Sequence, residues 1–348
     1  MEQTTELMLQ LLRASLNGST PNLPPLPYSE WERIYWLSRK HGVVTMVFDA
    51  IERLPEEEKP HGDIALSWEL SAERTRYHFA HQAQVLEPIK KKASEIGIPL
   101  ILIKGMTLAK LYPRPDSRAC GDIDIYFPNN YQKGNQLLGN PEAGLDGKHA
   151  EVVIDGVTVE NHLHFLDLNY RSQRKAEQYI IGSLHQATPD GELCPMANMV
   201  YLLMHTVCHL TAKYKLPLRN VIDWGIFLRA HQSQLDPAEC HRLMRKINME
   251  PAFNALTYLA SELVVTDISQ YIQKEKLRME DMTKLRDMIL DQSFVPPVPK
   301  EFKRLKRIIA RYKRNRQRRW LYRYLPSSPS ERLLLNLGGL FTRKTPSL

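Results

Sequence analysis

Apolar residues recur at helical spacing through the first 95 residues of the chain. Met8 and Leu12, for example, lie on one face of a helix. The same spacing predicts further helices over residues 29–41, 43–54 and 64–96. Gly42 and Gly97 follow two of these helices, as is common at helix C-termini. We therefore predict a helical N-terminal region over residues 1–95.

Strand-like patterns with turns between them replace the helical ones over residues 96–193. The apolar run over residues 98–103 is short enough for a buried strand. Apolar and polar residues alternate over residues 121–127, and alternating runs also flank Asp155-Gly156, a pair typical of a β-hairpin turn. We therefore predict an α/β core in this part of the chain.

Helical spacing resumes at Cys194. The predicted helices span residues 196–210, 218–231, 251–265 and 272–290. A proline-rich run over residues 294–300 then interrupts the pattern, because proline disrupts a helix interior. We predict a helical C-terminal domain over residues 194–298 and a basic tail over residues 299–348.

Two carboxylates lie on one face of the strand predicted around residue 123. Side chains alternate along a strand, so Asp122 and Asp124 point one way while Ile123 and Ile125 point the other. Carboxylates are costly to place together on an otherwise apolar strand unless a cation lies between them. A solvated strand edge is the alternative interpretation of this Asp-x-Asp pattern.

A third carboxylate arrives on the second arm of the predicted hairpin. Glu160 shares a face with Thr158 and His162, and this arm is a candidate neighbour of the Asp122/Asp124 strand. Carboxylate oxygens are the ligands that Mg²⁺ or Mn²⁺ prefers. We predict that Asp122, Asp124 and Glu160 are the catalytic and metal-binding residues.

A phosphate site is predicted just before these carboxylates. Gly105 directly follows the first apolar run and opens a short helical pattern that Pro113 ends. Free N–H groups at a helix start can bind phosphate, with Lys104 or Thr107 beside them. Arg118, in the loop before the carboxylates, is a candidate contact for the same triphosphate.

Histidines supply the remaining candidate contacts. His162 shares the face of Glu160, and it either orients this carboxylate or is an ordinary strand histidine. His205 and His209 lie one helical turn apart, which is a metal-binding spacing, but no HExxH motif accompanies them. Core histidines are the alternative. We predict that these two face the strand site together with Arg219 and Asp223, so that all four line the acceptor or base pocket.

The motifs together resemble those of a nucleotidyltransferase family within the DNA-polymerase-β-like nucleotidyltransferase superfamily. The matching residues are Lys104, Gly105, Leu108, Tyr112 and Pro113, then Arg118, Gly121, Asp122 and Asp124, then Glu160 and His162. The resemblance covers about residues 95–230. It implies an α+β fold in which helices flank a mixed sheet, with helical regions on both sides. It also implies two metal ions held by Asp122 and Asp124, with Glu160 completing the site or acting as base.

The sequence departs from the superfamily pattern at the phosphate site. The usual Gly-Ser pair is replaced here by Gly105-Met106, and Thr107 is the nearest hydroxyl. The interval from Gly105 to Asp122 is also long, which predicts an extra loop over residues 112–120.

Composition limits the cellular setting. The chain of 348 residues is 43% hydrophobic and 25% charged, values that are ordinary for a globular protein. The N-terminus lacks the layout of a secretory signal, and no apolar run approaches the roughly 20 residues that span a bilayer. The four cysteines form no CxxC pair. We therefore predict a cytoplasmic protein.

Positive charge is concentrated near the C-terminus. The chain carries a net charge of +8, and basic residues interleave with aromatic ones over residues 303–323. Such a segment suits a nucleic acid, an anionic membrane surface or an acidic partner. A solvated helix face is the simpler alternative.

These patterns lead to one functional hypothesis and two alternatives. We predict Mg²⁺-dependent transfer of a nucleoside monophosphate from an NTP to a hydroxyl-bearing acceptor, with release of pyrophosphate. A non-catalytic binding or scaffold protein with the same fold and a basic tail is the first alternative. A metal-dependent phosphoesterase that uses the same carboxylates is the second.

Overall fold

A computed structural model of the chain describes residues 3–145, 147–188, 190–212, 216–264, 267–290, 319–326 and 330–331. Within these ranges the strands form one mixed sheet in the order β1-β2-β4-β3. The strands are β1 (Ile101–Leu102), β2 (Ile123–Tyr126), β3 (His149–Ile154) and β4 (Val157–His162). β2 and β4 run parallel, whereas β1–β2 and β3–β4 are antiparallel. The predicted α+β class with a mixed sheet is confirmed.

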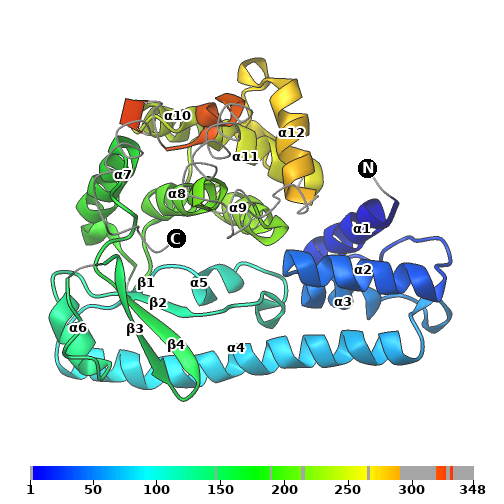
Figure 1. The fold of residues 1–348 in the computed structure, drawn as a ribbon, viewed down its shortest axis with the longest axis horizontal. Helices are drawn as coiled ribbons and strands as arrows, with labels where there is room; N and C mark the ends of the chain where they lie inside the picture. The colour runs from blue at the N-terminus through cyan, green and yellow to red at the C-terminus, as the bar shows by residue number, and fades with distance from the viewer. Residues whose placement is uncertain are drawn as a thin grey trace, which may run out of the picture.

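Helices surround this sheet and account for most of the described chain (Figure 1). They are α1 (Gln3–Asn17), α2 (Tyr28–His41), α3 (Val44–Ile51), α4 (Asp63–Glu95), α5 (Met106–Ala109), α6 (Tyr131–Leu137), α7 (Arg171–Gly182), α8 (Pro195–Ala212), α9 (Leu218–Ala230), α10 (Pro237–Lys246), α11 (Glu250–Leu263) and α12 (Met279–Leu290).

The predicted N-terminal helices agree with the structure, except that α3 ends at Ile51 and not at residue 54. α2 ends where Gly42 takes up a left-handed conformation with φ 69°, and the N–H of Gly42 bonds the carbonyls of Ser38 and Arg39. Glycine adopts this conformation at little cost. α4 ends two residues before Gly97, which also has a positive φ.

Several predicted elements are shorter in the structure. The strand predicted over residues 98–103 is reduced to β1, where Leu102 donates to Gly191 O and Ile103 donates to Asp124 O. The helix predicted to run from Gly105 to Pro113 ends at Ala109. The last predicted helix begins at Met279 instead of residue 272, because the preceding residues form 3₁₀ turns.

Three helices were not predicted: α6, α7 and α10. The buried face of α7 explains the failure there, because it contains Ser172, Gln173 and Glu177 beside Ala176 and Ile180. An apolar periodicity cannot be read from such a face.

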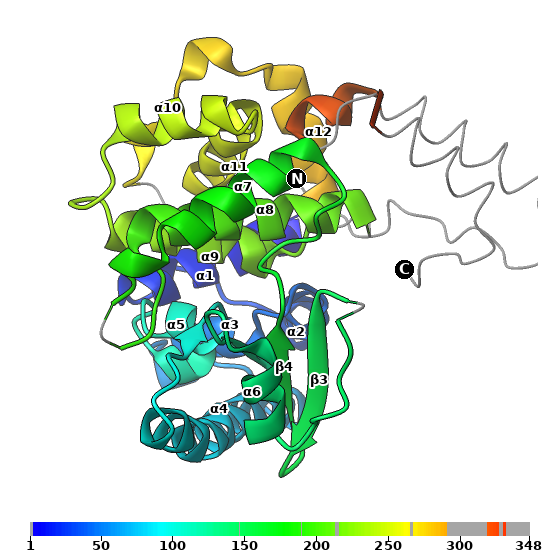
Figure 2. The ribbon, with the colours of Figure 1, turned by 90° about the vertical axis from the view of Figure 1, so that its left-hand side faces the viewer.

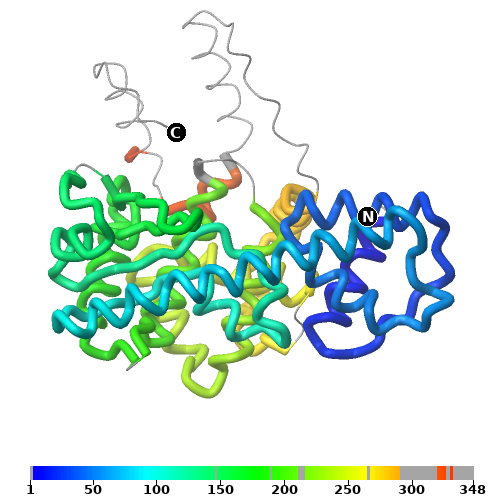
Figure 3. Tube along the Cα trace, turned by 90° about the horizontal axis from the view of Figure 1, so that it is seen from below, coloured from blue at the N-terminus to red at the C-terminus, as the bar shows by residue number. Residues whose placement is uncertain are grey.

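The two faces of the sheet pack against different parts of the chain. One face of the sheet packs on α4. The buried cluster there consists of side chains from β2 (Ile123 and Ile125), from β4 (Val157 and Val159) and from α4 (Val85, Leu86 and Ile89). Figure 3 shows α4 running along the underside of the molecule, below the sheet. The opposite face is turned towards the C-terminal helices, where Tyr126 contacts Phe165 with ring centroids 4.3 Å apart. The aspartates of β2 therefore face the C-terminal helices.

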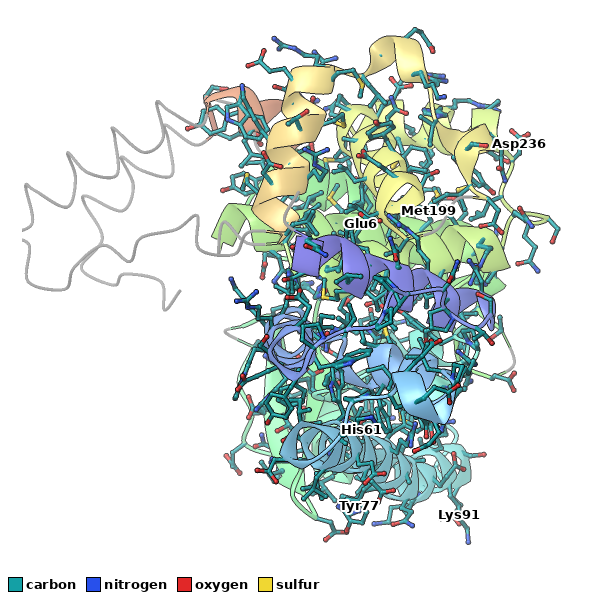
Figure 4. All side chains as sticks on the ribbon, turned by 90° about the vertical axis from the view of Figure 1, so that its right-hand side faces the viewer. Glu6, His61, Tyr77, Lys91, Met199 and Asp236 are labelled. Carbon is teal, nitrogen blue, oxygen red and sulfur yellow. The ribbon has the colours of Figure 1, made fainter. Side chains whose placement is uncertain are left out.

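The first and last described helices share a hydrophobic core. One cluster of buried apolar residues includes Leu12 of α1, Val221 of α9 and Leu259 of α11. The Arg13 side chain donates to Leu263 O at 2.9 Å, and Arg229 donates to Leu16 O at 3.1 Å. Figure 4 shows α1, on which Glu6 is labelled, against the C-terminal helices.

The predicted basic segment over residues 303–323 lies outside the described residues, apart from its last five. These five belong to a 3₁₀ helix, Arg319–Tyr324. Tyr324 donates to Asp281 Oδ2 at 2.9 Å, and Lys284 of α12 lies 5.5 Å from the centre of the Trp320 ring. These contacts fix the 3₁₀ helix against α12. Among the helices described here, none has the length and apolar character needed to cross a membrane.

Candidate functional site

The three predicted carboxylates lie together on the sheet face that is turned towards the C-terminal helices. β2 and β4 are parallel neighbours, and their register pairs Asp124 with Glu160. Residues paired in this way point to the same face. One ligand oxygen from each of Asp122, Asp124 and Glu160 lies within 4.8 Å of the others. The structure thus brings together the residues that alternation and the hairpin pattern selected.

Lys104 forms ion pairs with both aspartates. Its Nζ lies 3.1 Å from Asp124 Oδ1 and 3.6 Å from Asp122 Oδ2. Lys104 follows β1, and the pairing of β1 with β2 brings it to the aspartates. Burial alone would lower the pKa of Lys104, but the charges of Asp124 and Asp122 outweigh it and raise this pKa. Lys104 is therefore a firmly charged cation at this site.

The two aspartates differ in their environment. Burial raises the pKa of Asp122, and the nearby charge of Asp124 raises it further. Burial also opposes ionisation of Asp124, but a hydrogen bond from His162 and the charge of Lys104 reverse this effect and lower its pKa strongly. The lowered pKa favours the ionised form of Asp124, whereas Asp122, with a side chain that is 33% exposed, is the more open of the two.

A divalent cation fits this group of residues. Asp124 is buried, and its Oδ2 has no hydrogen-bond partner among the described residues. A buried carboxylate oxygen without a donor is costly unless a cation binds it. Asp122 and Glu160 supply further carboxylate oxygens within reach, and such oxygens are the ligands that Mg²⁺ and Mn²⁺ prefer.

His162 links two of the carboxylates. Its buried Nε2 lies 2.9 Å from Asp124 Oδ1 and 3.3 Å from Glu160 Oε2. Burial lowers the pKa of His162, but hydrogen bonds to Asp124 and Glu160 outweigh this effect and raise it. His162 thus lies beside Glu160, as predicted. It also contacts Asp124, which was not predicted.

His149 was not selected from the sequence. Its Nε2 lies 3.5 Å from Glu160 Oε1, and the register of the hairpin pairs it with His162. The signal was available, because a two-residue turn at Asp155-Gly156 places residue 149 opposite residue 162. In Figure 2, β3 lies at the outer edge of the sheet beside β4, and the His149 side chain is 34% exposed.

The predicted phosphate site has less support from the geometry. α5 has only four residues, so its dipole is small. Thr107 is buried, and its Oγ1 has no hydrogen-bond partner among the described residues. Gly105 has φ +67°, and a Cβ at this position would lie 3.4 Å from the carbonyl oxygen of Asp122. Contact of Lys104, Gly105 and Thr107 with phosphate therefore stays a prediction.

Arg118 and Asp223 form a buried ion pair. Arg118 Nε and Nη2 donate to the two oxygens of Asp223 at 2.7 and 2.8 Å, and Tyr112 donates to Asp223 Oδ1 at 2.7 Å. Arg118 Nη1 donates to Gly105 O at 3.2 Å. The Arg118 guanidinium is directed at these partners, and its predicted contact with a triphosphate remains untested.

Arg219 also contacts the loop before β2. Its Nη1 donates to Ala119 O at 2.9 Å. Asp223 pairs with Arg118, and the predicted place of Arg219 and Asp223 in the acceptor or base pocket stays untested. Together, the two arginines and Asp223 join α9 to the loop that leads into the carboxylate strand.

α8 turns a row of aromatic side chains towards the carboxylates. Tyr201 stacks on His205 with ring centroids 5.8 Å apart, and the Nε2 atoms of His205 and His209 lie 3.3 Å apart. Burial lowers the pKa of His205 far below its usual value, and the charge of Lys104 adds to this effect. Both histidines thus lie on the side of α8 that carries Tyr201, and their predicted place in the acceptor or base pocket stays untested.

Tyr201 is a further residue that the sequence analysis missed. It is buried, and its hydroxyl has no hydrogen-bond partner among the residues described. Burial raises the pKa of Tyr201 well above its usual value, and the charges of Asp124 and Asp122 raise it further. Tyr201 precedes His205 by one helical turn, and this spacing was the available signal.

Comparison with known proteins identifies the family. A family model described as an uncharacterised nucleotidyltransferase matches residues 27–264, which is more than half of the chain. Searches of curated proteins and of solved structures found no match. The matched range contains the sheet, the three carboxylates and α8. The chain belongs to this nucleotidyltransferase family.

Proposed function

We propose that this member of the nucleotidyltransferase family transfers a nucleoside monophosphate from an NTP to a hydroxyl-bearing acceptor, with release of pyrophosphate. The observation that carries the proposal is the convergence of Asp122, Asp124 and Glu160 from two parallel neighbouring strands. The family supports nucleotidyl transfer as the class of reaction. The choice of Mg²⁺, NTP and a hydroxyl acceptor is our inference from the chemistry of the site.

Asp122, Asp124 and Glu160 would hold the divalent cation. When bound, Mg²⁺ or Mn²⁺ supplies Lewis-acid stabilisation of the negative charge that develops on the phosphates during transfer. The buried Asp124 Oδ2, which has no hydrogen-bond partner among the described residues, supports this assignment.

The neighbouring side chains would orient the reactants and move the proton. Lys104 contacts both aspartates and would contact a phosphate oxygen bound beside them. His162 holds Asp124 and Glu160 in fixed relative positions. Glu160, whose side chain is 16% exposed, would accept the proton of the acceptor hydroxyl. The hydroxyl oxygen then bonds to the α-phosphorus, and the bond between this phosphorus and the β-phosphate oxygen breaks.

The acceptor would bind between the sheet and α8. Tyr201, His205 and His209 form the side of α8 nearest the carboxylates. A sugar, a small molecule, a protein side chain or an RNA end each carries a suitable hydroxyl. We also propose a cytoplasmic location, which the four free cysteines support.

The test is turnover of each NTP in the presence of Mg²⁺, followed by release of pyrophosphate and by mass spectrometry of candidate acceptors. We expect the Asp122→Ala/Asp124→Ala variant to lose turnover by at least about a thousandfold, because this variant removes the ligands of the Lewis acid. The matched control is Glu69→Ala/Glu73→Ala, which removes two exposed carboxylates from α4. Unaltered turnover in the Asp122/Asp124 variant would refute the mechanism.

The same assay separates the two alternatives. Release of phosphate in place of pyrophosphate would identify a phosphoesterase. Calorimetry that detects no metal-dependent binding of any NTP would favour the non-catalytic scaffold protein. Binding of the predicted nucleic-acid or membrane partners through residues 303–323 would then be the next measurement, at two salt concentrations, because electrostatic binding weakens as salt rises.

A further inference from the structure

The hairpin carries a second group of metal-ligating side chains beside the carboxylates. His149 of β3 and Glu160 and His162 of β4 each offer one ligand atom, and these atoms lie within 4.8 Å of one another. His149 Nε2 lies 3.5 Å from Glu160 Oε1, and His162 Nε2 lies 3.3 Å from Glu160 Oε2. The centroids of the two imidazole rings lie 5.2 Å apart, and the ring planes are inclined at 42°.

These distances match the spacing of ligands around one small ion. Ligand atoms about 2.1 Å from a tetrahedral metal ion lie about 3.4 Å from each other. Both contacts of Glu160 with the histidines are within 0.2 Å of this spacing. Small side-chain rotations would therefore place both Nε2 atoms and a Glu160 oxygen around one ion.

The orientation of His162 suits a metal ligand. Its Nδ1 lies 3.3 Å from the backbone oxygen of His164, which can only accept a hydrogen bond. Without a metal ion, Nε2 carries a proton and donates to Asp124 Oδ1 at 2.9 Å, with Glu160 Oε2 at 3.3 Å. A bound metal ion would displace this proton, and the contact with His164 O would hold the remaining proton on Nδ1. Metal-binding histidines generally have such an acceptor on their second nitrogen.

We propose that His149, Glu160 and His162 form a second cation site that binds a divalent first-row transition-metal ion, such as Zn²⁺ or Co²⁺, in preference to Mg²⁺. Imidazole nitrogen suits these ions, whereas Mg²⁺ requires oxygen ligands. His149 is on the edge strand and partly exposed, so an ion can reach the site from solvent. The inference goes beyond the proposed function, because binding of this ion requires no nucleotide.

The experiment is a titration of the full chain with Co²⁺, without nucleotide and with Mg²⁺ present in millimolar excess. Strong visible absorption reports Co²⁺ that is held with a low coordination number at a protein site, because hydrated octahedral Co²⁺ absorbs only weakly. We expect the wild-type chain to develop these absorption bands. His149→Ala should weaken Co²⁺ binding by at least about tenfold, since it removes one of the three protein ligands.

Two control variants make the result specific. His185→Ala removes an exposed histidine elsewhere and should retain wild-type Co²⁺ binding. Asp122→Asn removes an oxygen ligand of the other group and should retain the absorption bands. Circular dichroism during thermal unfolding should show that His149→Ala folds, and His149→Gln serves as a second variant if it does not.

Wild-type Co²⁺ binding in both His149 variants would overturn the proposal, as would a wild-type chain without the absorption bands. These outcomes are independent of nucleotidyl transfer, because the titration contains no NTP. The two proposals can therefore fail separately. Loss of NTP turnover in the Asp122→Ala/Asp124→Ala variant would support the proposed function. Absence of Co²⁺ bands from the wild type would, in the same set of experiments, reject the histidine site.

Discussion

At the scale of single residues, the two oxygens of Asp124 have different environments. Oδ1 accepts from His162 at 2.9 Å and pairs with Lys104 at 3.1 Å. Oδ2 has no hydrogen-bond partner among the described residues. The sequence sufficed to place Asp124 on the same face as Asp122, because alternation along a strand fixes the facing of side chains.

Other contacts of the site depend on tertiary packing and could not be predicted from local patterns. The pairing of Arg118 with Asp223 joins residues 105 positions apart in the sequence. Helical periodicity in the predicted helix over residues 218–231 carries no information about a partner so far away in the sequence. His149 and Tyr201 could have been predicted from local patterns. The register of the hairpin pairs His149 with His162, and helical spacing places Tyr201 one turn before His205.

Breaking the Arg118–Asp223 pair is predicted to destabilise the fold. In Arg118→Met, the Asp223 carboxylate would stay buried without its bidentate partner, and such a loss typically costs about 3–5 kcal/mol. Chemical denaturation would measure the change. The double variant Arg118→Met/Asp223→Leu should recover part of the loss, because it leaves no unpaired charge. Equal stability of Arg118→Met and the wild type would contradict the prediction.

His41 is predicted to make the stability depend on pH. Burial lowers the pKa of His41 from 6.5 to about 4, and the charge of Lys40 contributes. Between these two pH values the unfolded chain binds a proton that the folded chain does not. Stability should therefore fall as the pH decreases from 6.5 to 4, by up to about 3 kcal/mol from this residue.

The measurement is urea denaturation of the wild type and of His41→Gln at pH 7 and pH 4.5. The wild type should lose more stability between these pH values than the variant. His61→Gln, which changes an exposed histidine labelled in Figure 4, should behave like the wild type. Identical pH dependence in the wild type and His41→Gln would contradict the assignment.

At the scale of elements, close packing decides where a helix lies on the sheet. Gly134 of α6 packs on the ring of Phe127, and a Cβ at residue 134 would come within 2.1 Å of this ring. Phe127 is buried beneath α6 and has little room to move. Helical periodicity could not reveal α6, because its sequence is short and polar and its fit depends on a glycine.

Gly134→Ala is therefore predicted to destabilise the protein by about 1–3 kcal/mol through overpacking. Helix propensity alone predicts the opposite sign, a gain of about 1 kcal/mol. Thermal unfolding would distinguish the two. Lys133→Ala changes an exposed residue of the same helix and should stay within about 0.5 kcal/mol of the wild type. A more stable Gly134→Ala variant would show that Phe127 can move aside.

An apolar pattern predicted the strands of the hairpin correctly, but it overestimated the length of β1. The Asp155-Gly156 turn and both of its arms agree with the prediction, because turn residues and alternation are local signals. β1 is only Ile101–Leu102, because its ladder with β2 consists of two residue pairs, although Ile103 also donates to Asp124 O. Apolar runs indicate burial, but the length of a strand depends on which neighbours are present.

At the scale of the whole molecule, the hydrophobic core crosses the predicted boundary at residue 95. The cluster that contains Leu12 of α1 also contains Leu259 of α11 and Leu285 of α12. Hydrogen bonds from Arg13 and Arg229 link the same parts. The division into a core and separate helical regions stays a prediction, whereas the shared cluster predicts that these regions unfold together.

Leu12→Ala tests this coupling. Leu12 is fully buried, and loss of its side chain should cost about 2–5 kcal/mol. Hydrogen exchange followed by mass spectrometry should show reduced protection in α11 as well as in α1. Unchanged protection in α11, with lower protection in α1 alone, would show that the two parts unfold independently.

The parallel pairing of β2 with β4 has a thermodynamic consequence for the search for ligands. Asp124 and Glu160 are neighbours only in the assembled sheet, so the unfolded chain has no comparable binding site. By mass action, any metal ion or nucleotide that binds there must raise the melting temperature. A ligand at one hundred times its dissociation constant contributes about 2.7 kcal/mol. A thermal-shift screen of metal ions and NTPs would thus rank candidate ligands of this chain even before an acceptor is identified.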